Sequence, residues 1–223
     1  MTQPENASVL IQLQELRLTP ELPLIVTDAD EVLVEFISGL ERYLEANDYW
    51  LDLKSFAITG NVRRKDTSDL LNRDQVQELL GAFFASETEI LDPVDGAAAA
   101  LRALHPRSQI LVLSNVPLPQ AQARRNWLHK HGMNYPLIAN SGSKADAMRY
   151  LADNIAAPVF FLDDLPPHIE AVAAAAPGVH LLHFIANARL SSLIGPAKQC
   201  HLRTSSWPEA QAFIEQRLDA LGY

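Results

Sequence analysis

Short runs of apolar residues restrict the fold of this chain more than any other feature of its sequence. The clearest runs lie at 24–26, 110–113 and 158–162, with weaker candidates at 136–139 and 179–185. In the clear runs apolar residues do not alternate with polar ones, which is typical of strands buried on both faces of a parallel sheet. The runs therefore predict a central parallel sheet.

Helical patterns separate these runs. Asp92 is placed to cap a helix with Pro93 at its first position, and Gly132 is a natural end for another. Ser143, with Asp146 three residues later, resembles a capping box. The expected helices cover 93–104, 119–131, 143–156, 167–176 and 208–221. The alternation predicts an α/β fold of three layers, with a Rossmann-like parallel sheet between helices.

Residues 35–90 interrupt the alternation. Apolar residues recur there at helical spacing in two segments, on either side of a polar stretch at 59–72. We interpret the region as a small, mostly helical insertion that stands over the sheet. We therefore expect a core domain made of residues 1–34 and 91–223, with residues 35–90 as the insertion.

Composition and charge exclude several classes of protein. Hydrophobic residues make up 48% of the chain and charged residues 20%, which excludes a disordered chain or a coiled coil. There is neither an apolar run of the roughly 18 to 20 residues that a membrane span needs nor a secretory signal. Cys200 is the only cysteine, which excludes an intrachain disulfide, and a net charge of -9 disfavours binding to nucleic acid. We expect a cytoplasmic protein that acts on small molecules.

Polar residues follow the predicted strands, at the sheet edge where ligands bind in open parallel folds. They are Asp28, Asp30, Ser114, Asn115, Lys144, Asp163 and Asp164. Each alone has an ordinary explanation, since an aspartate after a strand is more often a helix cap and a lysine is usually a surface charge. Four carboxylates together, however, repel one another unless a cation neutralises them, and oxygen ligands suit Mg²⁺. The set therefore predicts a Mg²⁺ site.

Four segments carry these residues in the order LIVTDADEV, ILVLSN, SGSK and VFFLDD. They resemble the four motifs of the haloacid dehalogenase-like (HAD) superfamily, and the resemblance runs from about residue 22 to residue 185. It implies a HAD-like fold and makes the insertion a small helical cap of the type called C1. Such a cap would close over a small substrate and exclude water.

The resemblance implies the chemistry of the aspartates. Asp28 would attack phosphorus and form an aspartyl-phosphate, and Asp30 would act as general acid and then as general base. Asp163 and Asp164 would ligate Mg²⁺ together with the Asp28 carboxylate and the Asp30 carbonyl. Dehalogenases of the superfamily lack an acid/base aspartate two residues after the nucleophile, transport ATPases have threonine there and phosphonatases have alanine. Asp30 therefore indicates a phosphatase or a phosphomutase.

The remaining motif residues would bind and neutralise the phosphoryl group. Ser114 would hydrogen-bond a phosphoryl oxygen, Asn115 beside it is assigned to substrate binding, and Lys144 would neutralise the nucleophile and the phosphoryl charge. Glu31 departs from the pattern, because glycine, threonine or asparagine is commoner at its position. We expect Glu31 to face the linker to the cap or the solvent.

The polar stretch of the insertion holds the candidate specificity residues Asn61, Arg63 and Arg64. Gly60 before them allows a tight turn, and the arginines could hold a second anionic group of the substrate. A solvated cluster of loop charges is the alternative for each of them.

Taken together, the sequence predicts a Mg²⁺-dependent phosphatase that hydrolyses a small phosphorylated metabolite through an aspartyl-phosphate. A phosphomutase with the same aspartates, or a HAD-like scaffold or binding protein without catalysis, remains an alternative. A phospho-receiver domain is disfavoured, since its acidic pair lies on the first strand and its phosphorylated aspartate comes later. The identity of the substrate, the role of the first 20 residues and the oligomeric state, a homodimer included, stay open.

Overall fold

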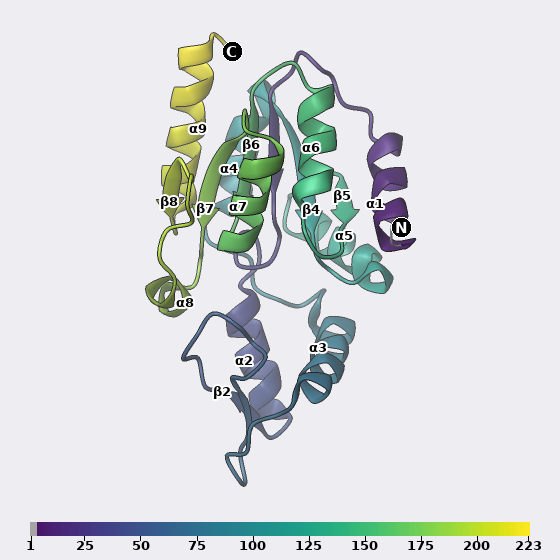
Figure 1. Cartoon of the computed structure of the whole chain (residues 1–223), viewed down its shortest axis with the longest axis vertical. Coiled ribbons are helices and arrows are strands. Elements are labelled where there is room, and N and C mark those ends of the chain that lie inside the picture. The colour runs from purple at the N-terminus through teal and green to yellow at the C-terminus, as the bar shows by residue number, and fades with distance from the viewer. Residues whose placement is uncertain (1–3) are drawn as a thin grey trace.

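A six-stranded parallel sheet forms the centre of the molecule (Figure 1). The computed structural model describes residues 4–223, so residues 1–3 of the expected core domain lie outside it. The strand order is β5-β4-β1-β6-β7-β8. The strands are β1 (Leu24–Thr27), β4 (Gln109–Ser114), β5 (Leu137–Ala139), β6 (Val159–Asp163), β7 (His180–Phe184) and β8 (Leu202–Thr204). The parallel sheet is thus confirmed, and each apolar run of the sequence forms one of its strands.

Helices cover both faces of this sheet (Figure 1). On one face lie α4 (Ala97–Leu104), α5 (Ala121–Lys130) and α9 (Trp207–Leu221). On the other lie α1 (Pro4–Glu15), α6 (Ala145–Asn154) and α7 (Pro166–Ala175), while α8 (Ala188–Leu193) and two 3-10 turns, His105–Arg107 and Leu118–Gln120, lie in connections. Leu24 and Val26 of β1 pack against the face covered by α1, α6 and α7, and Ile25 packs against the face covered by α4, α5 and α9. Both faces of the strand are therefore buried, which explains why the run is apolar throughout. No helix in the described residues is long and apolar enough to cross a membrane.

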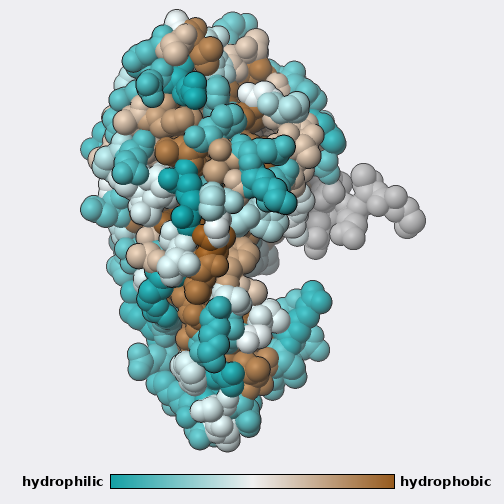
Figure 2. All heavy atoms as spheres, turned by 60° about the vertical axis from the view of Figure 1, so that its left-hand side comes forward, coloured by the Kyte–Doolittle hydropathy of each residue, from teal (hydrophilic) through white to brown (hydrophobic). Residues whose placement is uncertain are grey.

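The insertion lies between β1 and β4, at the carboxyl end of the sheet (Figure 1). It consists of α2 (Phe36–Ala46), β2 (Tyr49–Leu51), β3 (Val62–Arg64) and α3 (Arg73–Glu87). Phe36 of α2 packs edge-on against Phe83 of α3, with 5.3 Å between the ring centres. The space-filling view shows the insertion as a narrower lobe beneath the core (Figure 2). The helical insertion after the first strand is confirmed, although the antiparallel pair β2–β3 was not predicted.

Two buried tryptophans fasten the segments that connect the insertion to the core. The indole N–H of Trp207 donates to the carbonyl of Val32 at 2.8 Å, on the way into the insertion. That of Trp127 donates to the carbonyl of Leu91 at 2.7 Å, on the way out. The two connecting segments also pair with each other, since the amide of Val94 donates to the carbonyl of Leu33 at 2.8 Å. Hydrogen bonds therefore hold both segments that connect the insertion to the core.

Glu31 joins the insertion to the core through its carboxylate. Its Oε1 accepts the backbone N–H of Ile37 in α2 at 2.6 Å, and its Oε2 accepts that of Asn187, the N-cap of α8, at 3.1 Å. The side chain is buried, and burial raises the pKa of Glu31 to about 7. The expectation that Glu31 faces the linker or the solvent is thus correct only in that it contacts the start of the insertion.

The N-terminal helix α1, which the sequence patterns did not predict, closes one edge of the sheet. The side-chain amide of Gln12 pairs with the backbone of Ala139 in β5 as a neighbouring strand would. Its Nε2 donates to the Ala139 carbonyl at 3.1 Å, and its Oε1 accepts the Ala139 N–H at 3.0 Å. Exposed strand edges invite pairing with other chains, and Gln12 removes one pair of free groups from this edge.

Two helix starts differ from the expected ones. α4 begins at Ala97 instead of Pro93, because Asp92 and Pro93 belong to the connecting segment and Gly96 precedes the helix with a left-handed φ of 79°. α6 begins at Ala145, and the Ser143 hydroxyl accepts the N–H of Ala145 at 3.3 Å, so the expected capping box does not form.

Replacing Glu31 by alanine tests the joint between insertion and core. Glu31→Ala leaves two backbone N–H groups without their acceptor, and we expect a loss of about 2–4 kcal/mol in the free energy of unfolding. Urea unfolding of the parent and the variant under the same conditions measures this loss. The control Glu45→Ala removes an exposed glutamate and should cost at most about 0.5 kcal/mol. Equal losses for the two variants would contradict this role of Glu31.

Candidate functional site

Three aspartates meet at the carboxyl ends of the neighbouring strands β1 and β6. Asp28 follows β1, Asp163 is the last residue of β6, and Asp164 comes next. All three are buried, and one carboxylate oxygen from each lies within 4.8 Å of the others. The pairing of β1 with β6, in which Thr27 lies opposite Leu162, brings them together. The structure thus gathers three of the four aspartates that the sequence singled out.

Lys144 supplies the positive charge of this cluster. Its Nζ lies 2.8 Å from Oδ1 of Asp28 and 2.7 Å from Oδ2 of Asp163, and its side chain is completely buried just before α6. Burial alone would lower the pKa of Lys144, but the two carboxylates outweigh it and raise the pKa above its ordinary value. Lys144 is therefore a fixed cation between two strands.

One lysine does not balance three carboxylates. Burial, opposed by Lys144 and reinforced by Asp163, raises the pKa of Asp28 to about 6. Burial and the charge of Asp163 also hold the pKa of Asp164 well above its usual range. Asp163 is also buried, yet Lys144 and His168 outweigh burial and lower its pKa. This surplus of negative charge on oxygen donors fits a hard divalent cation, so the three aspartates could hold a metal ion.

Two histidines contact Asp163 and Asp164. Nδ1 of His168, in the first turn of α7, lies 3.1 Å from Oδ1 of Asp163. Nε2 of His183 lies 2.9 Å from the carbonyl of Asp164, while its Nδ1 accepts the N–H of Ala197 at 3.1 Å, so the Nε2–H donates to Asp164. Sequence reasoning assigned no role to any histidine, since none has a spacing typical of a site.

Ser114 and Asn115 lie at the end of β4, which pairs with the other side of β1. The buried Ser114 hydroxyl accepts the N–H of Val116 at 3.1 Å. The Asn115 amide donates to the carbonyl of Gly142 at 2.9 Å, and its Oδ1 accepts from Asn140 at 2.7 Å. Asn140, which sequence reasoning did not select, thereby joins the loop after β4 to the loop that leads to Lys144.

Asp30 lies beside the cluster and is paired with an arginine. Nη2 of Arg124, on the buried face of α5, donates to Oδ1 of Asp30 at 2.7 Å. The Asp30 side chain is 21% exposed, whereas that of Arg124 is fully buried. Arg124 was not among the predicted site residues. Its only signal in the sequence is a position three residues before Trp127, on the apolar face of that helix.

The candidate specificity residues bond within the insertion. The Asn61 side chain donates to the Ala57 carbonyl at 2.6 Å, and Nε of Arg63 donates to Asp52 at 2.8 Å. The Arg64 guanidinium lies 5.8 Å from the centre of the Tyr49 ring. In the part of the chain that the structure describes, none of the three bonds to Lys144 or to the aspartates at the carboxyl end of the sheet.

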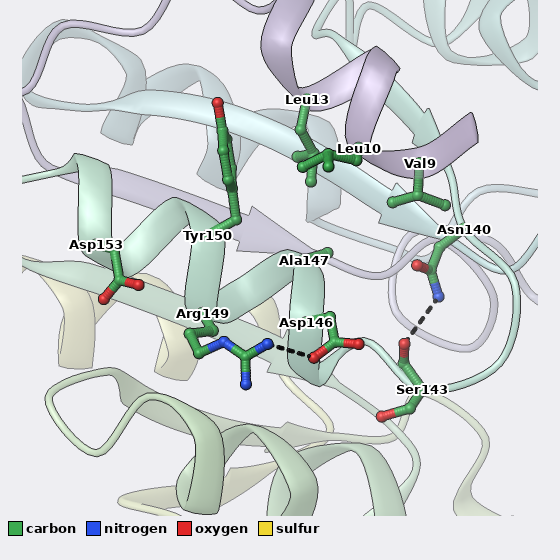
Figure 3. Close-up of a pocket in the computed structure, with 10 residues that line it drawn as sticks. All are labelled: Val9, Leu10, Leu13, Asn140, Ser143, Asp146, Ala147, Arg149, Tyr150 and Asp153. Atoms are coloured by element: carbon green, nitrogen blue, oxygen red, sulfur yellow. Dashed lines mark hydrogen bonds and ion pairs between the residues drawn. The ribbon is translucent and has the colours of Figure 1, made fainter. Parts of the chain in front are cut away.

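A groove of about 410 Å³ opens between α1 and α6, beside the loop that carries Lys144 (Figure 3). Asn140 and Ser143 lie at one end of it, and Arg149 pairs with Asp146 at 2.7 Å along its wall (Figure 3). Apolar side chains of both helices, among them Leu13, form the rest of the lining. The aspartates of the cluster do not line this groove.

Comparison with known proteins gives matches among solved structures. No protein-family model matches the chain. No curated protein matches it either. A haloacid dehalogenase-like hydrolase from Streptococcus pneumoniae is 15% identical with a TM-score of 0.60, over 88% of this chain and 100% of that one. A HAD family hydrolase from Deinococcus radiodurans R1, solved with bound phosphate and sodium, is 19% identical with a TM-score of 0.60, over 89% and 97%.

A third solved structure belongs to a protein from Haemophilus somnus 129PT described as a predicted phosphoglycolate phosphatase. It is 15% identical with a TM-score of 0.60, over 89% of this chain and 100% of that one. Each match spans nearly the whole of both chains, and at these identities each is a likeness of fold. This chain therefore has the haloacid dehalogenase-like fold, with a six-stranded parallel sheet and a mostly helical insertion after its first strand.

Proposed function

We propose that this protein is a Mg²⁺-dependent phosphatase that hydrolyses a small phosphorylated metabolite through a phosphorylated Asp28. The observation that carries the proposal is the position of Asp28: it is buried at the end of β1, bonded to Lys144, and close to Asp163 and Asp164. In this proposal residues 1–34 and 91–223 form the catalytic core and residues 35–90 its cap.

The geometry prepares Asp28 for nucleophilic attack. Its Oδ1 accepts the N–H of Ala29 at 2.7 Å and lies 2.8 Å from Nζ of Lys144, so the carboxylate has a fixed orientation before substrate binds. In the first step a carboxylate oxygen of Asp28 forms a bond to phosphorus, and the bond from phosphorus to the leaving oxygen breaks. Asp30 gives a proton to that oxygen, which leaves as an alcohol.

The second step restores the protein. Asp30 takes a proton from a water molecule, whose oxygen forms a bond to phosphorus, and the bond between phosphorus and Asp28 breaks. Inorganic phosphate leaves, and Asp28 and Asp30 return to their starting states. Ser114 and Lys144 would neutralise and orient the phosphoryl oxygens in both steps. Asn115, which donates to the Gly142 carbonyl in the loop before Lys144, would keep Ser114 and Lys144 at a fixed distance from each other.

The acidic cluster would hold the metal. The carboxylates of Asp28, Asp163 and Asp164, with the carbonyl of Asp30, would be its protein ligands. When bound, Mg²⁺ supplies positive charge that offsets the surplus of carboxylates and the charge of the phosphoryl group. The solved structure from Deinococcus, with its bound phosphate and sodium, and the Haemophilus protein described as a predicted phosphoglycolate phosphatase support the proposed phosphatase activity by likeness of fold.

The cap would select the substrate. Of the two candidate arginines, Arg64 is the one whose guanidinium makes no hydrogen bond in the described part of the chain, so we assign it to a second anionic group of the substrate. Asn61 and Arg63 would act by shaping the hairpin that carries Arg64, through their bonds to Ala57 and Asp52.

Replacing the nucleophile should abolish turnover. We expect Asp28→Asn to lower the rate of para-nitrophenyl phosphate hydrolysis with Mg²⁺ by at least about 10³-fold, because an amide cannot form the phosphorylated intermediate. The control Asp95→Asn makes the same change at an exposed carboxylate and should keep the parent rate. Hydrolysis by Asp28→Asn at the parent rate would show that another group is the nucleophile. An inactive parent protein would favour a phosphomutase or a scaffold.

Removing one metal ligand should raise the demand for metal. EDTA should stop hydrolysis, and Asp164→Asn should raise the Mg²⁺ concentration for half-maximal activity by about 10–100-fold, since the site loses one carboxylate. Titration of activity with Mg²⁺ measures this for the variant, the parent and the control Asp95→Asn. Activity that persists in EDTA would contradict the metal assignment.

A further inference from the structure

Arg124 is a buried cation whose hydrogen bonds are not all made. Its side chain is fully buried on α5, and among the described residues its ion-pair partner is Asp30. Nη2 makes that bond at 2.7 Å, while Nε and Nη1 are buried without any hydrogen-bond partner. Buried guanidinium groups are costly unless a carboxylate and further hydrogen bonds compensate them, so this arrangement calls for a physical reason.

Packing alone does not supply that reason. The other residues on the buried face of α5, Ala121, Trp127 and Leu128, are apolar side chains that fill the core, as this face of a helix requires. A methionine or leucine would fill the position of Arg124 without the cost of a buried charge. What distinguishes the arginine from such a residue is its bond to Asp30.

That bond fixes one oxygen of Asp30 and leaves the other free. Oδ1 accepts from Arg124, and Oδ2 makes no hydrogen bond to any described residue. Asp30 is partly exposed, two residues beyond Asp28. Its carboxylate therefore has a set orientation with one oxygen available. A group that passes protons must be held in reach of its partner, and small errors of position lower the rate strongly.

Arg124 itself is held in place. Its guanidinium carbon lies 5.7 Å from the centre of the Trp127 ring on the next turn of the helix. Trp127 in turn donates to the carbonyl of Leu91 in the segment that leaves the insertion. Asp30 is thus oriented by the side chain of Arg124, which is buried in the core and lies beside Trp127.

We propose that Arg124 is a positioning residue for Asp30, which it orients so that Oδ2 can give a proton to the leaving oxygen and take one from water. This inference rests on the proposed function, in which Asp28 is the nucleophile and Asp30 the acid and base. It predicts that loss of Arg124 harms reactions that need the proton from Asp30 more than reactions that do not.

Two matched substrates test this with the whole protein and Mg²⁺. Nitrophenolate is a good leaving group that needs little protonation, whereas the phenolate of phenyl phosphate needs more. We expect Arg124→Met, which keeps an unbranched apolar chain at this position and removes the charge, to lower kcat/KM for phenyl phosphate about 10-fold more than kcat/KM for para-nitrophenyl phosphate. The comparison uses kcat/KM because this quantity reports on the step in which the leaving group departs, whereas the later hydrolysis of phosphorylated Asp28 is the same for both substrates.

Further variants guard against a merely structural effect. Arg124→Lys keeps a cation near Asp30 and should recover most of the selective loss. If Arg124→Met does not fold, Arg124→Gln, which removes the charge but keeps a polar side chain, carries the test. Asp30→Asn should show the same selectivity between the substrates. Adding Arg124→Met to Asp30→Asn should change kcat/KM for either substrate by less than about 2-fold, because the two residues act as one unit.

The outcomes separate this inference from the proposed function. If the parent hydrolyses both substrates and Asp28→Asn does not, equal losses for the two substrates in the Arg124 variants overturn only the role of Arg124. Independent effects of the Arg124 and Asp30 substitutions would overturn it as well. If Asp28→Asn is as active as the parent, or the parent hydrolyses neither substrate, the proposed function fails and this inference fails with it.

Discussion

The two ion pairs of Lys144 are the interaction on which the rest of the site depends. They join the end of β1 to the end of β6 through a buried cation, at 2.8 Å to Asp28 and 2.7 Å to Asp163. Without Lys144, adjacent strands would present uncompensated carboxylates in the interior, which a folded chain does not tolerate. With it, the cluster still carries surplus negative charge, because Asp164 has no cation of its own. This surplus of carboxylate oxygens over cations is why the three aspartates could hold a metal ion.

The surroundings of the cluster restrict movement of its parts. His168 contacts the Asp163 carboxylate and His183 donates to the Asp164 carbonyl. Asn140 links the loop of Asn115 to the loop that leads to Lys144. Glu31, Trp127 and Trp207 hydrogen-bond to backbone groups in and beside the two segments that connect the insertion to the core. These contacts fix the position from which the insertion could cover the site, and preorganisation of this kind is what phosphoryl transfer requires.

Much of the fold follows from sequence patterns, because the strands of the sheet are buried on both faces. Leu24 and Val26 enter one core and Ile25 the other, so the run is apolar throughout. The edge strand β8 and the short helix α8 carry no such pattern, since they are short and partly exposed. The aspartates and Lys144 could be selected from the sequence because they follow strands. Arg124 could not, because its bond to Asp30 spans 94 positions of the sequence and exists only in the folded chain.

Chemical trapping tests most directly whether phosphorylated Asp28 forms during the reaction. Asp30→Asn should slow the hydrolysis of the intermediate, so incubation with para-nitrophenyl phosphate and Mg²⁺, acid quenching and borohydride reduction should convert the labelled aspartate to homoserine. Mass spectrometry of the peptides should then find homoserine at position 28 and aspartate at positions 163 and 164. Homoserine at another position, or none in a variant that still releases nitrophenol, would show that the reaction does not pass through phosphorylated Asp28.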